Sequence, residues 1–429
     1  MLRLDRAPMG WNSWDCYGAA VTEDTVRSNA KYMADHLKDA GYEYVVVDIQ
    51  WYEPGSENNE YHPFADLCMD EYGRLLPAPN RFPSAEGGKG FKPLADYVHS
   101  LGLKFGIHIM RGIPRGAVSR NTPVLGTDGI CARDIAKTAS ICVWNTDNYG
   151  VDPTKKGARA YYDSIFALYA SWGVDFIKCD DICRELPHEE EELVMLSEAL
   201  MNCGRDMVLS LSPGPAIIDK SEVYKKTGNM WRITDDFWDD WKLLYAMFER
   251  AEKWSIHTGP GHYPDADMLP VGAIRQVYDK DAWTAFTENE QITMMLLWCV
   301  LRSPLMIGGE MTKNDDFTLD LLTNKGLMDM HKLSRHAHQV YRRHEGDNEI
   351  ILWTAVRADE DGCGYNGQYV VVFNADGEDA KIKVDPAELE LTIPPDMKVT
   401  DIMTGDEISF DDGIAVAKHC GRGFLITFR

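Results

Sequence analysis

The strongest constraint on the fold of this chain is a regular alternation of strand-like and helix-like segments between residues 9 and 308. Short apolar runs are each followed by a segment in which apolar residues recur with helical spacing. The runs lie at Met9–Trp14, Tyr44–Trp51, Lys104–Met110, Phe176–Asp180, Met207–Ser212, Trp231–Asp236, weakly near Ser255, and Leu305–Gly308. Eight such units predict an α/β fold, a closed (β/α)8 TIM barrel of parallel strands.

The helical segments carry the expected end signals. In the first, Thr22 is suited to be the N-cap, apolar residues follow from Val26 to Leu37 with helical spacing, and Gly41 ends the segment. Further helices are expected at Phe91–Leu101, Ala158–Trp172, Glu189–Leu200, Phe237–Lys253 and Glu288–Arg302. Two connections, Tyr52–Gly90 and Arg111–Asp152, are too long to be simple turns, so we expect them to shape a substrate pocket.

After about Tyr341 the pattern changes to apolar residues with period two and tight turns. The strand-like runs are Ile350–Val356, Tyr369–Phe373, Ala380–Val384, Lys398–Ile402 and Phe424–Phe428. This pattern predicts an antiparallel β-sandwich that covers one side of the barrel. We therefore divide the chain into a catalytic barrel at residues 1–340 and a C-terminal β-sandwich domain at residues 341–429.

Charge and composition narrow the choice of partners and location. The net charge of −24 argues against nucleic acid and against anionic membranes, because both select basic surfaces. The N-terminus lacks a signal-peptide core, and no apolar run is long enough to span a membrane. Ten scattered cysteines favour reduced thiols in a cytoplasmic protein. Oligomeric state is left open, and a homo-oligomer is compatible with the sequence.

The sequence lacks the motifs of metal-binding, dinucleotide-binding and serine-hydrolase sites. Cys179 and Cys183 lack Cys-x-x-Cys spacing, and no second pair of ligands lies nearby, so we expect no metal site. The dinucleotide motif Gly-x-Gly-x-x-Gly and the serine-hydrolase motif Gly-x-Ser-x-Gly are both missing. The sequence therefore gives no support to a dinucleotide-binding enzyme or a serine hydrolase.

Carboxylates gather where the predicted strands end, which is the face on which barrels bind their substrates. They are Asp48, Asp180, Asp181, Asp235, Asp236, Asp265 and Asp267, and around them stand Trp14, Trp51, Trp231, Lys178 and Arg232. On the fourth strand, alternation turns Lys178 and Asp180 to the same side, so we expect Lys178 to keep Asp180 ionised. Carboxylates beside flat aromatic faces are typical of a sugar site.

Glycoside hydrolysis needs two carboxyl groups on opposite sides of one anomeric carbon. Asp180 and Asp236 could face each other across the barrel mouth, with Asp236 in a dry or anionic setting beside Asp235 that keeps its proton. Other interpretations remain: an aspartate at a strand end is often a helix N-cap. His108 is either a core histidine or a substrate ligand, and Trp283, Trp298 and Trp353 are expected to pack.

The order of eight motifs resembles that of α-galactosidases of glycoside hydrolase family 27. The motifs are Met9-Gly-Trp-Asn-Ser-Trp14, Val47-Asp48, Arg81-Phe-Pro83, Gly102-Leu-Lys-Phe-Gly-Ile107, Lys178-x-Asp180, Trp231-Arg232-x-x-x-Asp236, Asp265-x-Asp-Met-Leu269 and Arg302-Ser-Pro-Leu-Met-Ile-Gly308. The resemblance implies a retaining α-glycosidase that uses no cofactor, with Asp180 as nucleophile and Asp236, and not Asp235, as acid/base. It also implies that the sugar is held by Trp14, Asp48, Lys178, Arg232 and Asp267.

Three positions depart from that family's pattern and bear on the sugar. Ile49 stands where the family usually has a second Asp, His108 where it has a Tyr, and Ser212 where galactosidases have a Glu. Ser212 resembles the α-N-acetylgalactosaminidases, and the family's active-site disulfide looks absent. With Trp51, the residues His108 and Ser212 complete the substrate-binding candidates.

The expected function is hydrolysis of a terminal α-linked galactose-like residue by a carbohydrate-specific, exo-acting enzyme. A second hypothesis keeps the mechanism and changes the sugar to an α-N-acetylgalactosaminide, a β-L-arabinopyranoside or an isomaltose-type α-glucoside. A third, of another class, is a non-catalytic glycan-binding barrel.

Overall fold

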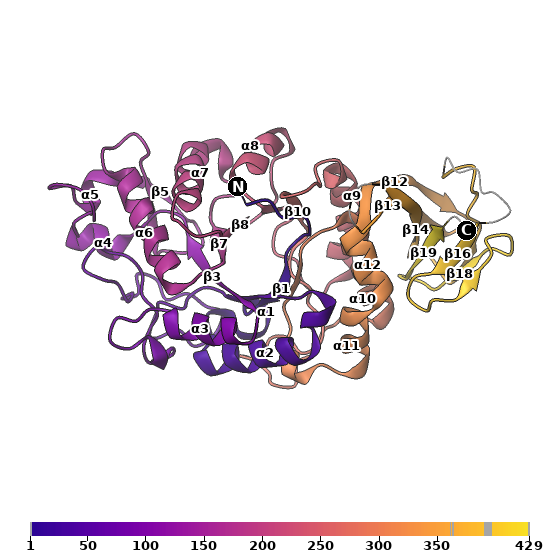
Figure 1. Ribbon diagram of the computed structural model, residues 1–429, viewed down its shortest axis with the longest axis horizontal. Helices are drawn as coiled ribbons and strands as arrows, with labels where there is room; N and C mark the ends of the chain where they lie inside the picture. The colour runs from indigo at the N-terminus through magenta and orange to yellow at the C-terminus, as the bar shows by residue number, and fades with distance from the viewer. Residues whose placement is uncertain (1, 361, 363, 390–396, 428–429) are drawn as a thin grey trace.

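The computed structural model describes residues 2–360, 362, 364–389 and 397–427 (Figure 1). Eight parallel strands form one curled sheet in the order β10-β9-β8-β7-β3-β2-β1-β11. Their bounds are β1 (Met9–Asn12), β2 (Tyr44–Val47), β3 (Lys104–Met110), β7 (Phe176–Asp180), β8 (Val208–Leu211), β9 (Met230–Arg232), β10 (Tyr263–Asp265) and β11 (Leu305–Ile307). Leu269, just after β10, exchanges backbone hydrogen bonds of 2.8 and 2.9 Å with Met306 and Gly308, which joins the two ends of the sheet. The predicted (β/α)8 barrel is confirmed.

Helices follow most of the strands and surround the sheet. They are α2 (Glu23–His36), α3 (Lys92–Ser100), α6 (Ala158–Trp172), α7 (Leu186–Met201), α8 (Ser221–Thr227), α9 (Trp241–Ser255), α10 (Glu288–Leu301), α11 (Asp316–Thr323) and α12 (Lys325–Leu333). The short helices α1 (Trp14–Tyr17), α4 (Arg115–Arg120) and α5 (Ala132–Ile135) lie in connections. The connection at residues 111–152 also holds a small antiparallel sheet of β4 (Ile113–Pro114), β5 (Ala136–Ile141) and β6 (Asn148–Val151).

Two predicted boundaries around the seventh unit are wrong. Ser255 is the last residue of α9, and the seventh strand is β10, which begins eight residues later at Tyr263. The preceding helix begins at Trp241 and not near Phe237, because the Asp240 side chain accepts a 2.8 Å hydrogen bond from the N–H of Lys242 and caps it there.

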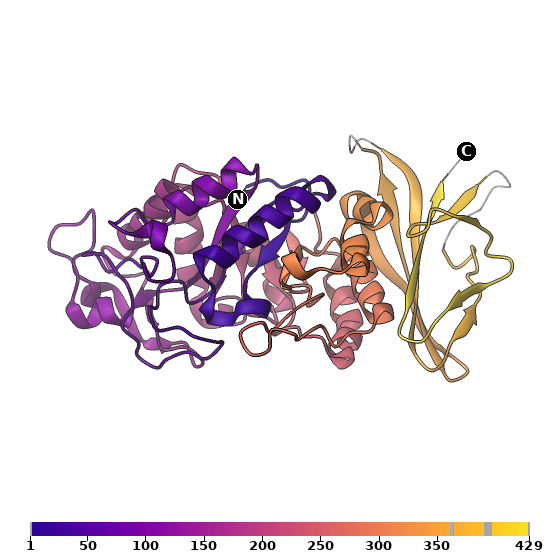
Figure 2. The same cartoon turned by 90° about the horizontal axis from the view of Figure 1, so that it is seen from below.

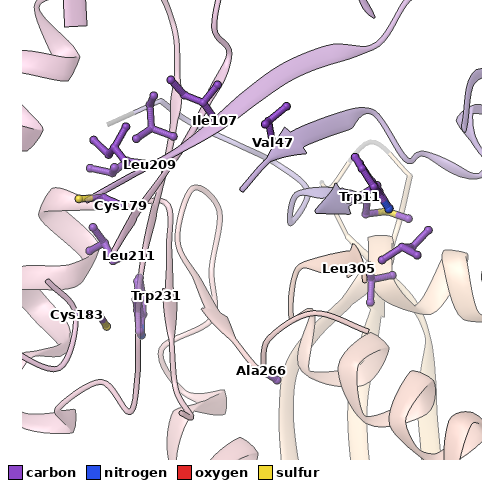
Figure 3. Packing of buried hydrophobic residues seen from close by; sticks show 14 of the residues in the cluster. Trp11, Val47, Ile107, Cys179, Cys183, Leu209, Leu211, Trp231, Ala266 and Leu305 are labelled. Atoms are coloured by element: carbon purple, nitrogen blue, oxygen red, sulfur yellow. The ribbon is translucent and has the colours of Figure 1, made fainter. Parts of the chain in front are cut away.

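The strands bury both faces. One set of side chains packs outward against the helices, and Figure 3 shows members of it on six strands: Trp11, Val47, Ile107, Cys179, Leu209, Leu211 and Trp231. The alternate set fills the barrel with Tyr44, Val46, Phe176, Val208, Met230 and Tyr263. Candidate site residues such as Asp48, Lys178 and Arg232 continue this inner set towards the carboxyl ends of their strands, so strand alternation alone aims them into the barrel mouth.

The C-terminal part is an antiparallel β domain, as predicted (Figure 2). Its larger sheet has the order β12 (Ser334–Glu345), β13 (Asn348–Ala358), β14 (Tyr365–Asp376), β19 (Gly421–Thr427), β16 (Lys398–Asp401) and β17 (Glu407–Ile408), and β15 (Ala380–Ile382) pairs separately with β18 (Ile414–Val416). Strand β12 runs across the position of the predicted domain boundary, which itself stays a prediction. Phe428, at the end of the last expected strand, lies outside the described residues.

The larger sheet has two apolar faces with different partners. Leu352 and Val370 pack with Ile382 and Ile414 of the two-stranded sheet, which makes the sandwich core. Residues of the opposite face, such as Trp353 and Phe373, belong instead to the core shared with the barrel helices. In Figure 1 the helices α9, α10 and α12 lie between the barrel strands and this sheet.

The nine cysteines within the described ranges are all free, and Cys16, Cys142, Cys179, Cys183 and Cys299 are buried. No helix in the described part of the chain is both long and apolar enough to cross a bilayer.

Candidate active site

A cavity of about 300 Å³ opens at the carboxyl ends of the barrel strands. Its walls are formed by Trp14, Asp15, Asp48, Ile49, Tyr61, Trp144, Lys178, Asp180, Arg184, Pro213, Arg232, Asp236, Phe237, Trp238, Asp267 and Met268. The structure therefore brings together seven of the ten residues predicted from sequence, including both carboxylates proposed to be catalytic. The volume suits one small, mostly enclosed ligand.

Asp180, the last residue of β7, is held ionised by three surrounding groups. Its Oδ1 accepts a 3.0 Å hydrogen bond from the Ser212 hydroxyl, and its Oδ2 lies 3.1 Å from Nε2 of His108. Burial alone would raise the pKa of Asp180, but the hydrogen bond and electrostatic interaction with His108, together with the charge of Lys178, hold that pKa well below its usual range. A buried carboxylate that stays charged is a suitable nucleophile.

Lys178 and Asp48 form a buried ion pair on the floor of the cavity. The Lys178 Nζ lies 2.8 Å from Asp48 Oδ2, which also accepts a 2.6 Å hydrogen bond from the Asn12 amide. Burial opposes the charge of Asp48, but Lys178 and His108 outweigh it and lower the pKa of the carboxyl. Both side chains keep polar atoms at the cavity wall, where they could bind sugar hydroxyls.

Arg232 joins the second predicted carboxylate to the site. Its guanidinium lies 3.1 Å from Asp236 Oδ1 and 2.7 Å from Asp267 Oδ2, and Asp267 also accepts a 2.8 Å hydrogen bond from the Phe237 N–H. The Asp236 side chain is 62% exposed, so the expectation that it lies in a dry setting is wrong for the free protein. Asp235 pairs at 2.9 Å with Arg184 of the cavity wall, but among the described residues Asp235 itself does not line the cavity. A ligand bound in the cavity would exclude water from the Asp236 side chain.

The buried side chain of Asp265 makes the stability of the fold depend on pH. Burial, followed by the charge of Asp267, raises its pKa to about 7. Between its unfolded and folded pKa values the folded state holds a proton that the unfolded state has lost, so the free energy of unfolding falls as pH rises through this window.

Replacing Asp265 with asparagine should remove this dependence. We expect Asp265→Asn to be about as stable as wild type at pH 5 and more stable, on the order of 1 kcal/mol or more, at pH 8. Urea unfolding at the two pH values measures the difference. Asp235→Asn, an exposed aspartate, is the matched control and should show no such pH dependence; an equal shift in both variants would contradict the assignment.

An aromatic wall on one side of the cavity was not predicted from sequence. The ring of Tyr61 stacks on Trp14, with centroids 5.9 Å apart and planes 21° apart, and lies 5.7 Å from the ring of Trp144. Tyr61 and Trp144 come from the two long connections that we expected to shape the pocket. Burial and the charges of Asp180 and Asp48 raise the pKa of Tyr61, so its hydroxyl stays protonated. The wall is suited to the apolar face of a sugar ring.

Three predicted substrate-binding residues lie behind the cavity wall and not in it. Trp51 is fully buried: its Nε1 donates a 2.7 Å hydrogen bond to the carbonyl of His108, and its ring packs against Phe91 and Trp172. The position of Trp51 in this outer core corrects its expected role as a platform. His108 and Ser212 are also buried and contact Asp180, so the structure places them to orient the nucleophile.

The backbone after the nucleophile is held by a buried ionic cluster. Asp181 adopts a positive φ of 60°, which is uncommon for a residue with a side chain. Arg111 at the end of β3 lies 3.0 Å from Asp181 Oδ2 and 3.2 Å from Glu192 Oε2, and its Nε donates a 2.5 Å hydrogen bond to the Asp181 carbonyl. These contacts fix the turn that follows Asp180 and tie the ends of β3 and β7 together.

The fold and the site together define a glycoside hydrolase: a barrel with an ionised carboxylate, a second carboxylate at the mouth of the same cavity, and an aromatic wall beside polar groups. A family model described as "Alpha galactosidase A" matches residues 7–118 and 147–332. The chain therefore belongs to the α-galactosidase family, glycoside hydrolase family 27.

Individual relatives vary in similarity. "Alpha-galactosidase" of Cyamopsis tetragonoloba is 27% identical over 98% of this chain and 86% of its own length. Among solved structures, a GH27 β-L-arabinopyranosidase from Geobacillus stearothermophilus with bound arabinose is 52% identical, with a TM-score of 0.92 over 99% of this chain and 98% of its own. A Bacillus halodurans C-125 protein, described provisionally as an α-N-acetylgalactosaminidase, is 48% identical, with a TM-score of 0.86 over 100% of both chains.

Proposed function

We propose that this protein is a retaining exo-glycosidase that removes terminal β-L-arabinopyranosyl residues. This revises our expectation of a galactose-like substrate in favour of one of the alternative sugars. β-L-Arabinopyranose has the ring stereochemistry of α-D-galactopyranose and lacks only the exocyclic hydroxymethyl group, so the two sugars would present the same hydroxyls to Asp48, Lys178 and Arg232.

The choice of sugar rests on the apolar side chain of Ile49. It is buried in the cavity wall directly after Asp48, where the family usually has a second aspartate. An isoleucine offers no hydrogen bond to the primary hydroxyl of galactose, and burying that hydroxyl unpaired costs binding energy. A sugar without the hydroxymethyl group avoids this cost. The 52% identity to a GH27 β-L-arabinopyranosidase supports the same choice.

The proposed mechanism is double displacement. The ionised Asp180 attacks the anomeric carbon while Asp236, protonated in the enclosed complex, gives its proton to the departing oxygen. The resulting glycosyl ester on Asp180 is then hydrolysed by a water molecule whose proton Asp236 accepts. His108 and Ser212 hold the Asp180 carboxylate during both steps.

An α-N-acetylgalactosaminide is the second candidate, supported by Ser212 and by the Bacillus halodurans relative. The Ser212 hydroxyl, however, donates its hydrogen bond to Asp180. It is therefore engaged with the nucleophile, and we rank this sugar below β-L-arabinopyranose. We also propose a cytoplasmic location, which the free cysteines of the described chain support.

A panel of aryl glycosides tests the proposal. Wild type should cleave the β-L-arabinopyranoside with a higher kcat/KM than the α-galactoside or the α-N-acetylgalactosaminide. Ile49→Asp should raise the ratio of galactoside to arabinopyranoside cleavage by about tenfold or more, because the carboxylate can bind the primary hydroxyl. Ile49→Leu, which keeps an apolar side chain, should leave the ratio unchanged. A wild type that prefers the galactoside would reject the choice of sugar.

A further inference from the structure

Arg111, at the end of β3, is surrounded by side chains from three other parts of the fold. Besides its contacts with Asp181 after β7, its Nη1 donates a 2.8 Å hydrogen bond to the hydroxyl of Ser140 on β5 and lies 3.2 Å from Glu192 Oε2 on α7. The Arg111 side chain is only 4% exposed. A buried guanidinium with these partners fixes the four segments relative to one another.

Ser140 leads to the aromatic wall of the catalytic cavity. It lies four residues before Trp144, on the strand that enters the Trp144 loop. Between them, Cys142 is buried, and its thiol interacts with the Asp181 side chain and with the N–H of Trp144. The connection that carries Trp144 is therefore attached to the same cluster that holds the turn after the nucleophile.

The cluster contains three carboxyl groups and two cations. Three carboxylates approach Arg111 within 3.9 Å: Asp181, Glu189 and Glu192. Lys137 of β5 is the second cation, 2.9 Å from Glu189 Oε2. Burial, opposed in part by the charge of Arg111, raises the pKa of Glu192 to about 7. With Glu192 protonated the charges balance, whereas ionised Glu192 adds an uncompensated charge and competes with Asp181 for the guanidinium.

No further cation contacts these acids within the described part of the chain. The ionisable groups facing Glu192 and Asp181 from the elements packed against them are Arg111, Lys137, Cys142, Tyr162, Cys179, Asp180, Glu185 and Glu189. Burial raises the pKa of Cys142, Cys179 and Tyr162, so all three stay neutral. Asp181, whose pKa burial raises to about 6, loses its proton first, and Glu192 is the group that changes charge near pH 7.

We propose that Arg111 is a positioning residue of the active site, whose guanidinium holds the turn after Asp180 and the connection that carries Trp144 as one unit. When Glu192 loses its proton, it draws the guanidinium away from the Asp181 carboxylate, so the nucleophile turn and the aromatic wall are both held less firmly. The kinetic consequences of this inference rest on the proposed glycosidase function. The placement of Trp144, in contrast, can be measured without turnover.

Fluorine NMR of protein labelled with fluorotryptophan follows Trp144 directly, and Trp144→Phe identifies its resonance. In wild type we expect this resonance to move with pH, with a midpoint near the Glu192 pKa of about 7. Glu192→Gln cannot ionise at this position, so its Trp144 resonance should not move near pH 7. Asp265 also has a pKa of about 7, and Asp265→Asn should keep the wild-type titration. A wild-type resonance that does not move, or a titration that survives in Glu192→Gln, would overturn the proposal.

Arg111→Lys tests the positioning role by kinetics. The variant keeps the positive charge, but one ammonium group cannot contact Ser140, Asp181 and Glu192 together. We expect a lower kcat and a higher KM for the preferred aryl glycoside, with a loss in kcat/KM of about tenfold or more, because the nucleophile and the cavity wall are both displaced. A variant that is merely less folded contains fewer active molecules, so its kcat would fall with KM unchanged, and that result would contradict the role of Arg111.

Arg205→Lys is the matched control, because Arg205 pairs with Asp175 and donates a 2.8 Å hydrogen bond to the Val174 carbonyl at the other end of β7. Its kcat/KM should stay within about twofold of wild type, and a loss equal to that of Arg111→Lys would count against the proposal. Thermal denaturation checks folding, and if Arg111→Lys does not fold, the NMR comparison of wild type with Glu192→Gln decides. If wild type cleaves none of the candidate glycosides, the proposed function fails, whereas the NMR titration still tests the coupling.

Discussion

Replacement of Asp180 by alanine is expected to lower the turnover of every glycoside that wild type cleaves by about 10⁴-fold or more, because the covalent intermediate cannot form. The carboxylate is the group that the surrounding side chains are arranged to keep charged: Ser212 and His108 contact it directly, and Lys178 lies on the same face of β7. No other described carboxylate of the cavity has this combination of neighbours.

Azide gives this experiment a readout beyond lost activity. In Asp180→Ala a small anion can occupy the vacated space and attack the anomeric carbon, so azide should restore turnover of an activated aryl glycoside and yield a glycosyl azide of inverted configuration. Thermal denaturation should show that the variant is folded. Activity that survives in the absence of azide would refute Asp180 as the nucleophile.

Replacement of Asp236 by alanine is expected to produce a different loss. Substrates with poor leaving groups should lose about 10²–10⁴-fold in kcat/KM, because nothing protonates the departing oxygen. Aryl glycosides with activated leaving groups should form the intermediate at a nearly normal rate but hydrolyse it slowly. Pre-steady-state mixing should therefore show a burst of released phenol followed by a low steady rate.

Asp235 provides a matched control for Asp236. The two aspartates are adjacent and their side chains are equally exposed, at 62%, but Asp236 lines the cavity, whereas Asp235 does not and pairs with Arg184 of the cavity wall. Asp235→Ala should keep kcat/KM within about threefold of wild type. If Asp235→Ala showed the burst and Asp236→Ala did not, the assignment of the acid/base would have to be exchanged.

The sequence was informative wherever a local pattern determines the structure. Strand β7 was predicted with its observed bounds, because an apolar run ends abruptly in charge, and strand alternation then placed Lys178 and Asp180 on one face. Strand β10 was missed because it has only three residues, Tyr263–Asp265, one of which is proline, and carries no apolar run. The barrel pattern predicted a seventh strand, but we placed it wrongly near Ser255, which ends α9.

Features that depend on contacts distant in sequence were harder to predict. Nothing near Trp51 distinguishes a sugar platform from a core tryptophan, because its burial depends on Phe91 and Trp172. Tyr61 and Trp144 reach the cavity from long connections whose paths leave no periodic signal. Asp236 was expected in a dry or anionic setting beside Asp235 because a general acid must keep its proton. In the structure, Asp235 pairs with Arg184, and Arg232 of β9 contacts the exposed Asp236.

The sheet behind the barrel helices limits how this enzyme can be divided. Trp353 and Phe373 pack into the same core as α9 and α10, and the Phe248 and Phe373 rings lie 4.9 Å apart. A chain truncated after α12 would expose the apolar surfaces of these helices to water, so the isolated barrel would tend to aggregate. Attempts to shorten or fuse this protein should treat both parts as a single unit, although no described residue beyond Met268 lines the cavity.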